Sequence, residues 1–318
     1  EYATAKENLN DHLYKSDEEQ QVILTTAVDI IKLPYDSNEY TTLTGNGSMP
    51  YQIVVSQDGN VYIALDYLAQ YTALQYSVEQ EPLHIIINNQ WGTKTFSDVI
   101  KEESVRLDAD IKSPILKKEA TGDKVTVLEQ EEEWTKVLTA DGYIGYMKSK
   151  KLSDSYEEQV TSDFRAAEYT SIHKDYDMNL LWHQVTSQDS NDALAADIQD
   201  VKGVNVISPT WFSISSNDGD ISSLASSDYV DTAHMEVWGL MDNFSTDIDT
   251  DTVLGTTTSR ENLEGQLITE ALNYQLDGIN IDIESLPEET SESYVQFMRE
   301  LSVKCRNNNL VLSVDVPS

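Results

Sequence analysis

The sequence has few cysteines and few basic residues, and each shortage excludes a class of protein. Cys305 is the only cysteine among 318 residues, so no disulfide can form within the chain. A chain of this length can bury enough apolar surface for two or three domains without one. Lysine and arginine number 21 against 56 aspartates and glutamates, which gives a net charge of −35. Nucleic-acid binding needs a clustered basic surface, so the composition argues against nucleic acid and against an anionic membrane surface as partners.

The sequence also lacks a long apolar run. No stretch is long and apolar enough to cross a membrane, so we expect no membrane insertion. Residues 1–7 lack the basic and apolar regions of a signal peptide. A mature secreted chain and a trimmed fragment both fit such a beginning. Localisation must therefore be judged from the domains that the chain contains.

The most informative stretch is the octapeptide 277–284, Asp-Gly-Ile-Asn-Ile-Asp-Ile-Glu. With the two-residue period of a strand, its three isoleucines lie on one face and Asn280, Asp282 and Glu284 on the other. An ordinary half-exposed strand also alternates, but aspartate and asparagine are poor strand formers, so the pattern favours a catalytic strand over that alternative. The pattern indicates a catalytic strand with Glu284 at its carboxyl end.

The segments around the octapeptide predict a parallel sheet. Apolar residues recur at helical spacing over 263–272 and again over 294–301, and residues 310–316 form a further apolar run. Helix, strand, helix, strand indicates a parallel sheet that is covered on both faces or closed into a barrel. In a closed barrel the acid face points into the lumen, where carboxylates need partners or shifted pKa values.

The octapeptide resembles the signature of the family 18 glycoside hydrolases, an Asp-Gly followed by acids at alternate positions and ending in the catalytic Glu. Asn280 departs from the commonest form, which has Asp there, and is similar to the bacterial branch with spore-cortex-lytic and other cell-wall N-acetylglucosaminidases. The resemblance implies Glu284 as proton donor, its pKa raised by burial and by the neighbouring acid. It implies that Asp282 orients the substrate's 2-acetamido group and that Asn280 hydrogen-bonds Asp282. The implied mechanism is substrate-assisted and retaining, and needs no metal or cofactor.

Further candidate residues lie at predicted strand ends or in the turn before the octapeptide. Trp211 is expected either to stack on a sugar face or to pack under a helix. Gln184, Trp238 and Asn243 are further candidates for substrate binding. Asp277 and Gly278 are expected to be structural, with Asp277 capping the turn beneath the sheet.

Five barrel strands are predicted from the apolar runs of the last domain. They are 178–185, 203–212, 235–241, the octapeptide and 310–316. A (β/α)8 barrel takes about 250 residues, whereas only about 140 follow Tyr176. We therefore expect the chain to be part of a longer protein, and the 318 residues alone to be inactive.

Two smaller units are predicted before the barrel. Residues 101–154 contain three short strands separated by turns, typical of a small barrel, and resemble a bacterial SH3 domain through Trp134 and the Gly-Tyr-Ile-Gly-Tyr run at 142–146. Such modules hold many related enzymes to the cell wall, but Trp134 and Tyr146 are equally consistent with core positions. Residues 21–100 resemble the copper amine oxidase N-terminal-like domain. His84 stands alone there, so no copper site is expected.

These patterns predict a multidomain protein with a small α+β N-terminal domain, an SH3-like β-barrel and the first five strands of a (β/α)8 TIM barrel. The expected divisions are a flexible lead-in at 1–20, the copper amine oxidase N-terminal-like domain at 21–100, the SH3-like domain at 101–154, a linker at 155–176 and the partial barrel at 177–318.

Two functional hypotheses follow. The first is an extracellular or cell-surface glycoside hydrolase that acts on peptidoglycan or a chitin-like glycan and binds the bacterial cell wall through the SH3-like domain. The second is a non-catalytic wall- or carbohydrate-binding protein with a drifted barrel. The intact Asp282 and Glu284 favour the hydrolase. A weaker third reading has Asp277, Asp282 and Glu284 holding Mg²⁺ or Ca²⁺, since hard oxygen ligands suit both ions.

Overall fold

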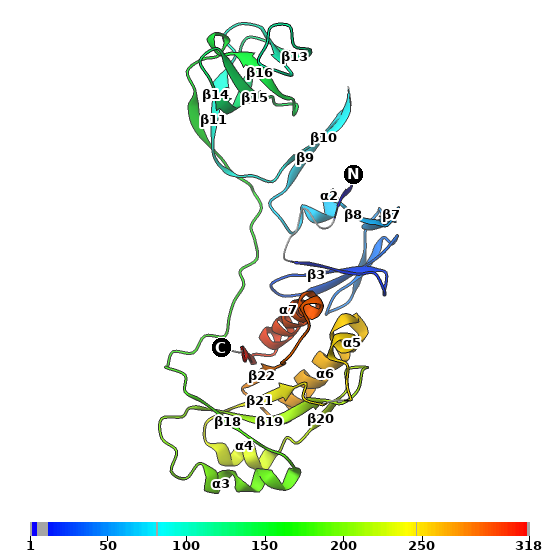
Figure 1. Cartoon of the computed structure of the whole chain (residues 1–318), viewed down its shortest axis with the longest axis vertical. Helices are drawn as coiled ribbons and strands as arrows, with labels where there is room; N and C mark the ends of the chain where they lie inside the picture. The colour runs from blue at the N-terminus through cyan, green and yellow to red at the C-terminus, as the bar shows by residue number, and fades with distance from the viewer. Residues whose placement is uncertain (1, 5–11, 81, 246, 317–318) are drawn as a thin grey trace. The chain divides into compact units, whose positions relative to one another are not determined.

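The computed structural model describes residues 2–4, 12–80, 82–245 and 247–316 (Figure 1). The chain divides into two compact units. One comprises Leu65–Ala166; the other combines Tyr2–Ala64 with Ala167–Ser318. In sequence, the first unit is thus an insertion between the two segments of the second. No helix among the described residues is long and apolar enough to cross a membrane.

The second unit contains a parallel sheet whose strands follow one another in chain order. The strands are β18 (Leu180–His183), β19 (Val206–Ile214), β21 (Glu236–Asp242), β22 (Gly278–Asp282) and β23 (Val311–Val314). A short strand, β20 (Ile221–Ser223), pairs antiparallel with β19. Sequential parallel strands separated by helices are the arrangement of the first strands of a β/α barrel, and the predicted fold class is confirmed.

Helices cover one face of this sheet. They are η2 (Gln188–Ala193), α3 (Leu194–Asp197), α4 (Ser227–Ala233), α5 (Thr250–Gly255), α6 (Thr257–Asn273), η3 (Glu288–Thr290) and α7 (Ser291–Asn307). Ile279 and Ile281 of β22 are fully buried in the same core as Leu267 of α6 and Phe297 of α7. Because side chains alternate along a strand, this packing leaves Asn280 and the other polar residues of β22 on the opposite face.

The N-terminal segment of the same unit folds into two antiparallel sheets. One has the order β2 (Leu13–Ser16), β3 (Gln21–Thr25), β4 (Ile30–Pro34), β5 (Glu39–Thr41) and β6 (Asn46–Ser48); the other has the order β1 (Tyr2–Thr4), β8 (Asn60–Ala64) and β7 (Val54–Gln57). Strands β1 and β2 lie where residues 1–20 were expected to be a flexible lead-in; residues 1 and 5–11 of that stretch lie outside the described residues. The stretch 13–16 is ordered because Tyr14 and Ser16 are buried.

The N-terminal strands pack against the helices of the parallel sheet. Tyr14 is buried in a small cluster with Val303 of α7, and the Arg260 guanidinium of α6 lies 4.6 Å from the Tyr14 ring centre. The Glu19 carboxylate accepts hydrogen bonds from the backbone N–H groups of Thr257 (3.1 Å) and Thr258 (2.9 Å), the first residues of α6. The structure therefore divides the expected 21–100 domain after residue 64, because the strands before that point share a core with α7.

The inserted unit contains a seven-stranded antiparallel sheet. Its order is β13 (Ile115–Glu119), β12 (Glu103–Arg106), β16 (Ile144–Lys148), β15 (Trp134–Leu138), β14 (Lys124–Gln130), β11 (Gly92–Asp98) and β17 (Tyr156–Val160). Val137 and Met147 belong to its core, whereas Trp134 and Tyr146 are only partly buried. The Nζ of Lys148 lies 5.5 Å from the Trp134 ring centre, and the Nζ of Lys136 lies 5.9 Å from that of Tyr146. The two aromatic rings therefore stand outside the core cluster, on the same face of the sheet as Lys136 and Lys148.

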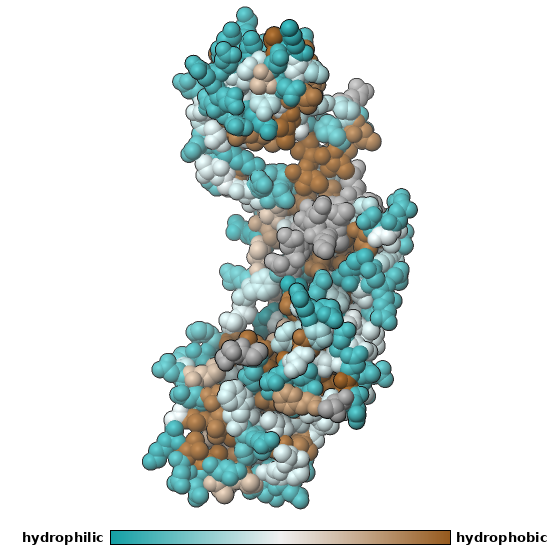
Figure 2. All heavy atoms as spheres, viewed as in Figure 1, coloured by the Kyte–Doolittle hydropathy of each residue, from teal (hydrophilic) through white to brown (hydrophobic). Residues whose placement is uncertain are grey.

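The same unit includes the helix α2 (Leu65–Leu68) and a hairpin of β9 (Gln75–Gln80) and β10 (Leu83–Asn88). One face of the hairpin is apolar and open, since Leu83 is 74%, Ile85 39% and Ile87 41% exposed. Figure 2 shows apolar side chains gathered over this hairpin. His84 on the other face lies within hydrogen-bonding distance of the carbonyl oxygens of Pro82 and Asp141 through its two ring nitrogens.

Candidate active site

Three carboxylates meet at the carboxyl edge of the parallel sheet. Asp242 is the last residue of β21 and pairs in register with Asp282, the last residue of β22. Asp315 follows β23, and its N–H donates to the carbonyl of Ile281 at 2.9 Å. Only Asp282 was predicted from the sequence. Asp242 and Asp315 share a signal that could have been used, because each is an acid directly after an apolar strand.

Asp282 ionises less readily than an isolated aspartate. Partial burial raises the pKa of this carboxyl, and the negative charges of Asp315, Glu284 and Asp242 raise it further. Like charges around a half-buried acid favour its protonated form. Asp282 can therefore hold a proton at a pH where a free aspartate has lost it.

Glu284 lies two residues beyond the end of β22, and its backbone is held by Asn243. The Glu284 N–H donates to Asn243 Oδ1 at 2.9 Å, and Asn243 Nδ2 donates to the Glu284 carbonyl at 3.0 Å. The next residue, Ser285, has a left-handed backbone (φ 57°), so the chain turns sharply there. Asn243, a predicted substrate-binding residue, therefore positions the segment that carries Glu284.

The Glu284 side chain is exposed, contrary to the expected burial. The physical reason is that β22 ends at Asp282, so the alternation of the strand no longer governs residue 284. The burial expected for the Glu284 side chain is therefore absent.

Asn280 is buried and bonds across the sheet, not along its own strand. Asn280 Oδ1 accepts from Ser313 Oγ at 2.6 Å, and Asn280 Nδ2 donates to Asp315 Oδ2 at 2.9 Å. The predicted bond to Asp282 was wrong. Residues two apart on a strand are about 6.5 Å apart, whereas directly paired residues on neighbouring strands are about 5 Å apart. Ser313 is the cross-strand partner of Asn280, so its side chain is closer to Asn280 than that of Asp282 is.

Trp182 joins this cluster from the far strand of the sheet. Its Nε1 donates to Asp315 Oδ2 at 3.1 Å, although Trp182 lies on β18 and Asp315 follows β23. The sheet is therefore curled enough to bring residues of its first and last strands into contact. The side chain of Trp182 is 58% exposed. No local pattern in the sequence singles it out.

Two other predicted substrate-binding residues are buried. Trp211 is 1% exposed in the core beneath the helices, and its Nε1 donates to Asn191 Oδ1 at 2.8 Å. Of its two expected roles, the structure shows packing. Trp238 is fully buried, and its Nε1 donates to Glu236 Oε2 at 3.1 Å. Both rings are buried and therefore out of reach of a substrate, Trp211 in the core under the helices and Trp238 in a smaller cluster with Val206 and Val311. Gln184 is exposed just past β18.

Asp277 and Gly278 have structural contacts at the other end of β22. Asp277 Oδ2 accepts from the N–H of Val237 at 2.9 Å. A Cβ on Gly278 would lie 2.8 Å from the carbonyl oxygen of Val311, so only glycine fits there. Asp277 precedes β22 and Asp282 ends it, so five steps of extended chain place their Cα atoms about 16 Å apart, too far for the two carboxylates to share one cation with Glu284. Among the described residues, no group of three or more potential ligands could hold a metal ion.

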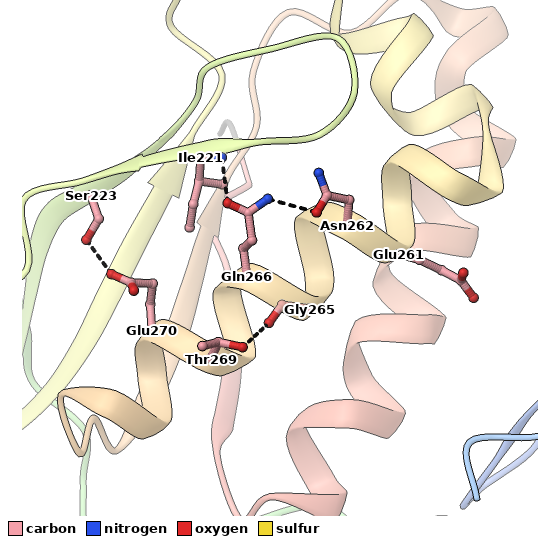
Figure 3. Close-up of a pocket in the computed structure, with 8 residues that line it drawn as sticks. All are labelled: Ile221, Ser223, Glu261, Asn262, Gly265, Gln266, Thr269 and Glu270. Atoms are coloured by element: carbon pink, nitrogen blue, oxygen red, sulfur yellow. Dashed lines mark hydrogen bonds between the residues drawn. The ribbon is translucent and has the colours of Figure 1, made fainter. Parts of the chain in front are cut away.

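A surface pocket of about 380 Å³ lies away from these acids, on α6 and β20 (Figure 3). It is lined by Ile221, Ser223, Glu261, Asn262, Gly265, Gln266, Thr269 and Glu270. Ser223 Oγ donates to Glu270 Oε2 at 2.6 Å, and Gln266 Nε2 donates to Asn262 Oδ1 at 3.0 Å. Its polar groups thus bond to one another, and none comes from the carboxyl edge of the sheet.

Comparison with protein families finds a bacterial SH3 domain at residues 104–153, which confirms the prediction for this segment. No curated protein shows significant similarity to the chain. The matches give no support to the expected likeness of 21–100 to the copper amine oxidase domain.

Solved structures with similarity to the chain include three bacterial proteins. The C-terminal domain of a putative chitinase from Desulfitobacterium hafniense DCB-2 is 19% identical, with 43% of this chain and 45% of that chain covered and a TM-score of 0.38. The spore cortex-lytic enzyme SleL from Bacillus cereus is 18% identical over 49% and 39%, with a TM-score of 0.39. The putative sporulation-specific glycosylase ydhD from Bacillus subtilis is 22% identical over 35% and 39%, with a TM-score of 0.33. The chain spans less than half of each, and the activity must be argued from its own residues.

Proposed function

We propose that the parallel-sheet unit is the catalytic part of a glycoside hydrolase that cleaves β-linked N-acetylglucosamine glycans with retention of configuration. The observation that carries the proposal is the pair of acids at the carboxyl end of β22. Asp282 is half-buried among other carboxylates, and Glu284 is two residues further along, on a backbone fixed by Asn243. The carboxyl ends of parallel strands are where β/α enzymes bind substrate.

The two acids differ in what they can do. Glu284, exposed and on a fixed turn, is the proton donor to the glycosidic oxygen. Asp282 faces the 2-acetamido group of the sugar, and its ionised form accepts the acetamido N–H. The acetamido oxygen then bonds to the anomeric carbon as the glycosidic bond breaks and the proton of Glu284 passes to the leaving oxygen. In the second step water attacks the same carbon, the bond from that carbon to the acetamido oxygen breaks, and Glu284 takes a proton from the water, so two inversions give net retention.

The SH3 domain is proposed to bind the bacterial cell wall. Its partly buried Trp134 and Tyr146 lie on neighbouring strands, each beside a lysine, and present rings and charge outside the core. This assignment implies an extracellular or cell-surface protein. Peptidoglycan and chitin-like glycans both carry the N-acetyl group that the mechanism requires, so both are offered in the test.

The test is Glu284→Gln in the protein as encoded by its gene. Release of reducing ends is measured from chitin oligosaccharides and from purified peptidoglycan. Loss of the proton donor is expected to reduce kcat by about 10²–10⁴-fold, with the fold intact by circular dichroism. Glu288→Gln is the matched control, because Glu288 is equally exposed and four residues further on. Full activity of Glu284→Gln would refute the role. Wild-type protein that binds sacculi but releases no reducing ends from either glycan would favour a non-catalytic wall-binding protein.

A further inference from the structure

Asp315 lies at the centre of a hydrogen-bonded cluster that joins three strands. Its Oδ2 accepts from Asn280 Nδ2 of β22 at 2.9 Å and from Trp182 Nε1 of β18 at 3.1 Å. Asn280 is itself fixed by Ser313 Oγ, which donates to its Oδ1 at 2.6 Å. Both donors to Asp315 are neutral groups. They fix the carboxylate in place without cancelling its charge.

Three segments around Asp282 present acidic groups. Asp242 comes from β21, Glu284 from the turn after β22 and Asp315 from the end of β23. Tyr294 of α7 faces the same group, and the pKa of its phenol is raised by burial and by the charges of Asp282 and Asp315. Within the described ranges, no lysine, arginine or histidine forms an ion pair with any of these acids. The negative charge around Asp282 is therefore uncompensated.

The three acidic neighbours differ in how firmly they are held. Among the described residues, Asp242 Oδ1 accepts one hydrogen bond, from the N–H of Phe244 at 3.2 Å, and the Glu284 side chain is exposed. Asp315 accepts from two side chains on two other strands, and its own N–H is bonded to β22. Of the charges acting on Asp282, that of Asp315 is the largest, after the effect of burial. A charge held at a fixed place acts on its neighbour more consistently than one on a mobile side chain.

We propose that Asp315 is a positioning residue that controls the ionisation of Asp282, and that Asn280 and Trp182 hold it in place for that role. The inference rests on the proposed function for its consequence, because only ionised Asp282 accepts the acetamido N–H. Asp315 then sets the acid limit of the pH range in which the enzyme works. Its charge keeps the proton on Asp282 to higher pH, and its removal moves that limit to lower pH.

Three variants separate the charge from the hydrogen bonds. Asp315→Asn removes the charge but keeps an oxygen that can accept from Trp182 and Asn280. Trp182→Phe removes one donor and keeps an aromatic ring. The double variant Asn280→Asp/Asp315→Asn exchanges the carboxylate and the amide, so that residue 315 donates and residue 280 accepts, with Ser313 Oγ still able to donate to residue 280. Asp231→Asn is the control, because Asp231 is exposed on α4 and has no part in this cluster.

The readout is the titration of the Asp282 carboxyl carbon by NMR in protein labelled with ¹³C-aspartate, its signal assigned with Asp282→Asn. The midpoint is expected at lower pH in Asp315→Asn, less strongly so in Trp182→Phe, and restored toward the wild-type value by the exchange. Asp231→Asn should titrate like the wild type. An unchanged Asp282 midpoint in Asp315→Asn would overturn the inference. If that variant does not fold, an unchanged midpoint in Trp182→Phe overturns it.

The same variants distinguish this inference from the proposed function. The titration is measured in the free protein and needs no turnover. A lowered midpoint in a protein that cleaves neither glycan supports the role of Asp315 and refutes the hydrolase. If both the wild type and Asp315→Asn cleave a glycan, and kcat/KM falls off at the same acidic pH in both, the hydrolase is supported and the role of Asp315 is refuted.

Discussion

Glu19→Ala is expected to weaken the attachment of the N-terminal strands to α6. In the wild type the Glu19 carboxylate accepts from the N–H groups of Thr257 and Thr258 and from Thr258 Oγ1 at 2.8 Å. The residue at the start of this helix, Thr256, makes no side-chain capping bond of its own. Glu19 is more than 230 residues away in sequence and supplies the cap that the helix lacks.

The size of the destabilisation by Glu19→Ala follows from the shift in the pKa of the Glu19 carboxyl. The bonds to Thr257 and Thr258 outweigh the opposing effect of burial and lower the pKa of Glu19 from 4.5 to about 2. By linkage such a shift corresponds to roughly 3 kcal/mol, and the partial exposure of the carboxylate reduces this to about 1–2 kcal/mol. Loss of a helix cap costs a similar amount, about 0.5–2 kcal/mol.

The effect should depend on pH with a definite sign. A carboxyl whose pKa is lower in the folded state stabilises that state above its unfolded pKa, near 4.5, and loses this effect as the pH falls toward 2. Glu19→Ala should therefore lower the free energy of unfolding at pH 7 by about 1–2 kcal/mol. The difference from the wild type should shrink steadily below pH 4.5.

Urea unfolding followed by circular dichroism, at a series of pH values from 7 to 3, measures this difference. Glu18→Ala is the matched control, because Glu18 is the exposed neighbour. Equal stability of Glu19→Ala and wild type at pH 7 would refute the capping role. A difference that stays constant down to pH 3 would refute its electrostatic origin.

Three further predictions concern packing in the unit that contains the parallel sheet. Gly278→Ala should cost about 1–3 kcal/mol, because its Cβ would lie 2.8 Å from the Val311 carbonyl oxygen and 3.0 Å from Trp238 Cδ1. Gly265→Ala, with open space around its Cβ on α6, should instead add about 0.5–1 kcal/mol in the same thermal or urea measurement. Cys305 is 1% exposed, and burial raises the pKa of its thiol to about 12. At pH 8 the Cys305 thiol should react with a disulfide reagent only after the protein unfolds. An immediate reaction in the native protein would contradict the burial.

The sequence predicted the elements whose signal is local. The isoleucines at alternate positions of the octapeptide mark β22 as a strand, and the four-residue spacing of Phe297 and Leu301 marks α7 as a helix. Asp282 and Glu284 were proposed for the same reason, since they alternate with the isoleucines, whereas Asp242 and Asp315 were missed. Asp277 and Gly278 were predicted to be structural in a turn; their contacts in the structure are with neighbouring strands, Asp277 with Val237 and Gly278 with Val311.

The contacts that sequence reasoning missed join distant residues. Asn280 was paired with Asp282, its neighbour on the strand, because the register that places Ser313 beside it is set by β23. Trp182 and Asp315 meet through the curl of the whole sheet, 133 residues apart. Trp238 was proposed as a substrate contact, and Trp211 was left between stacking on a sugar and packing under a helix, because a tryptophan near a strand end gives no local sign of which face it occupies. The period of a strand or a helix can be seen within one segment of the sequence. The burial of a side chain and its hydrogen-bond partners depend on other segments that pack against it.

The insertion of the SH3-containing unit determines how a mechanical load on that unit would reach the parallel-sheet unit. The inserted unit leaves the parallel-sheet unit after Ala64 and rejoins it at Ala167, so it is connected at both ends. A force applied to the inserted unit divides between two connections, one at β8 and the other leading to β18. A protease that cuts one connection does not release the parallel-sheet unit. The second connection still holds it, as do the contacts of Tyr14 and Glu19 with the helices.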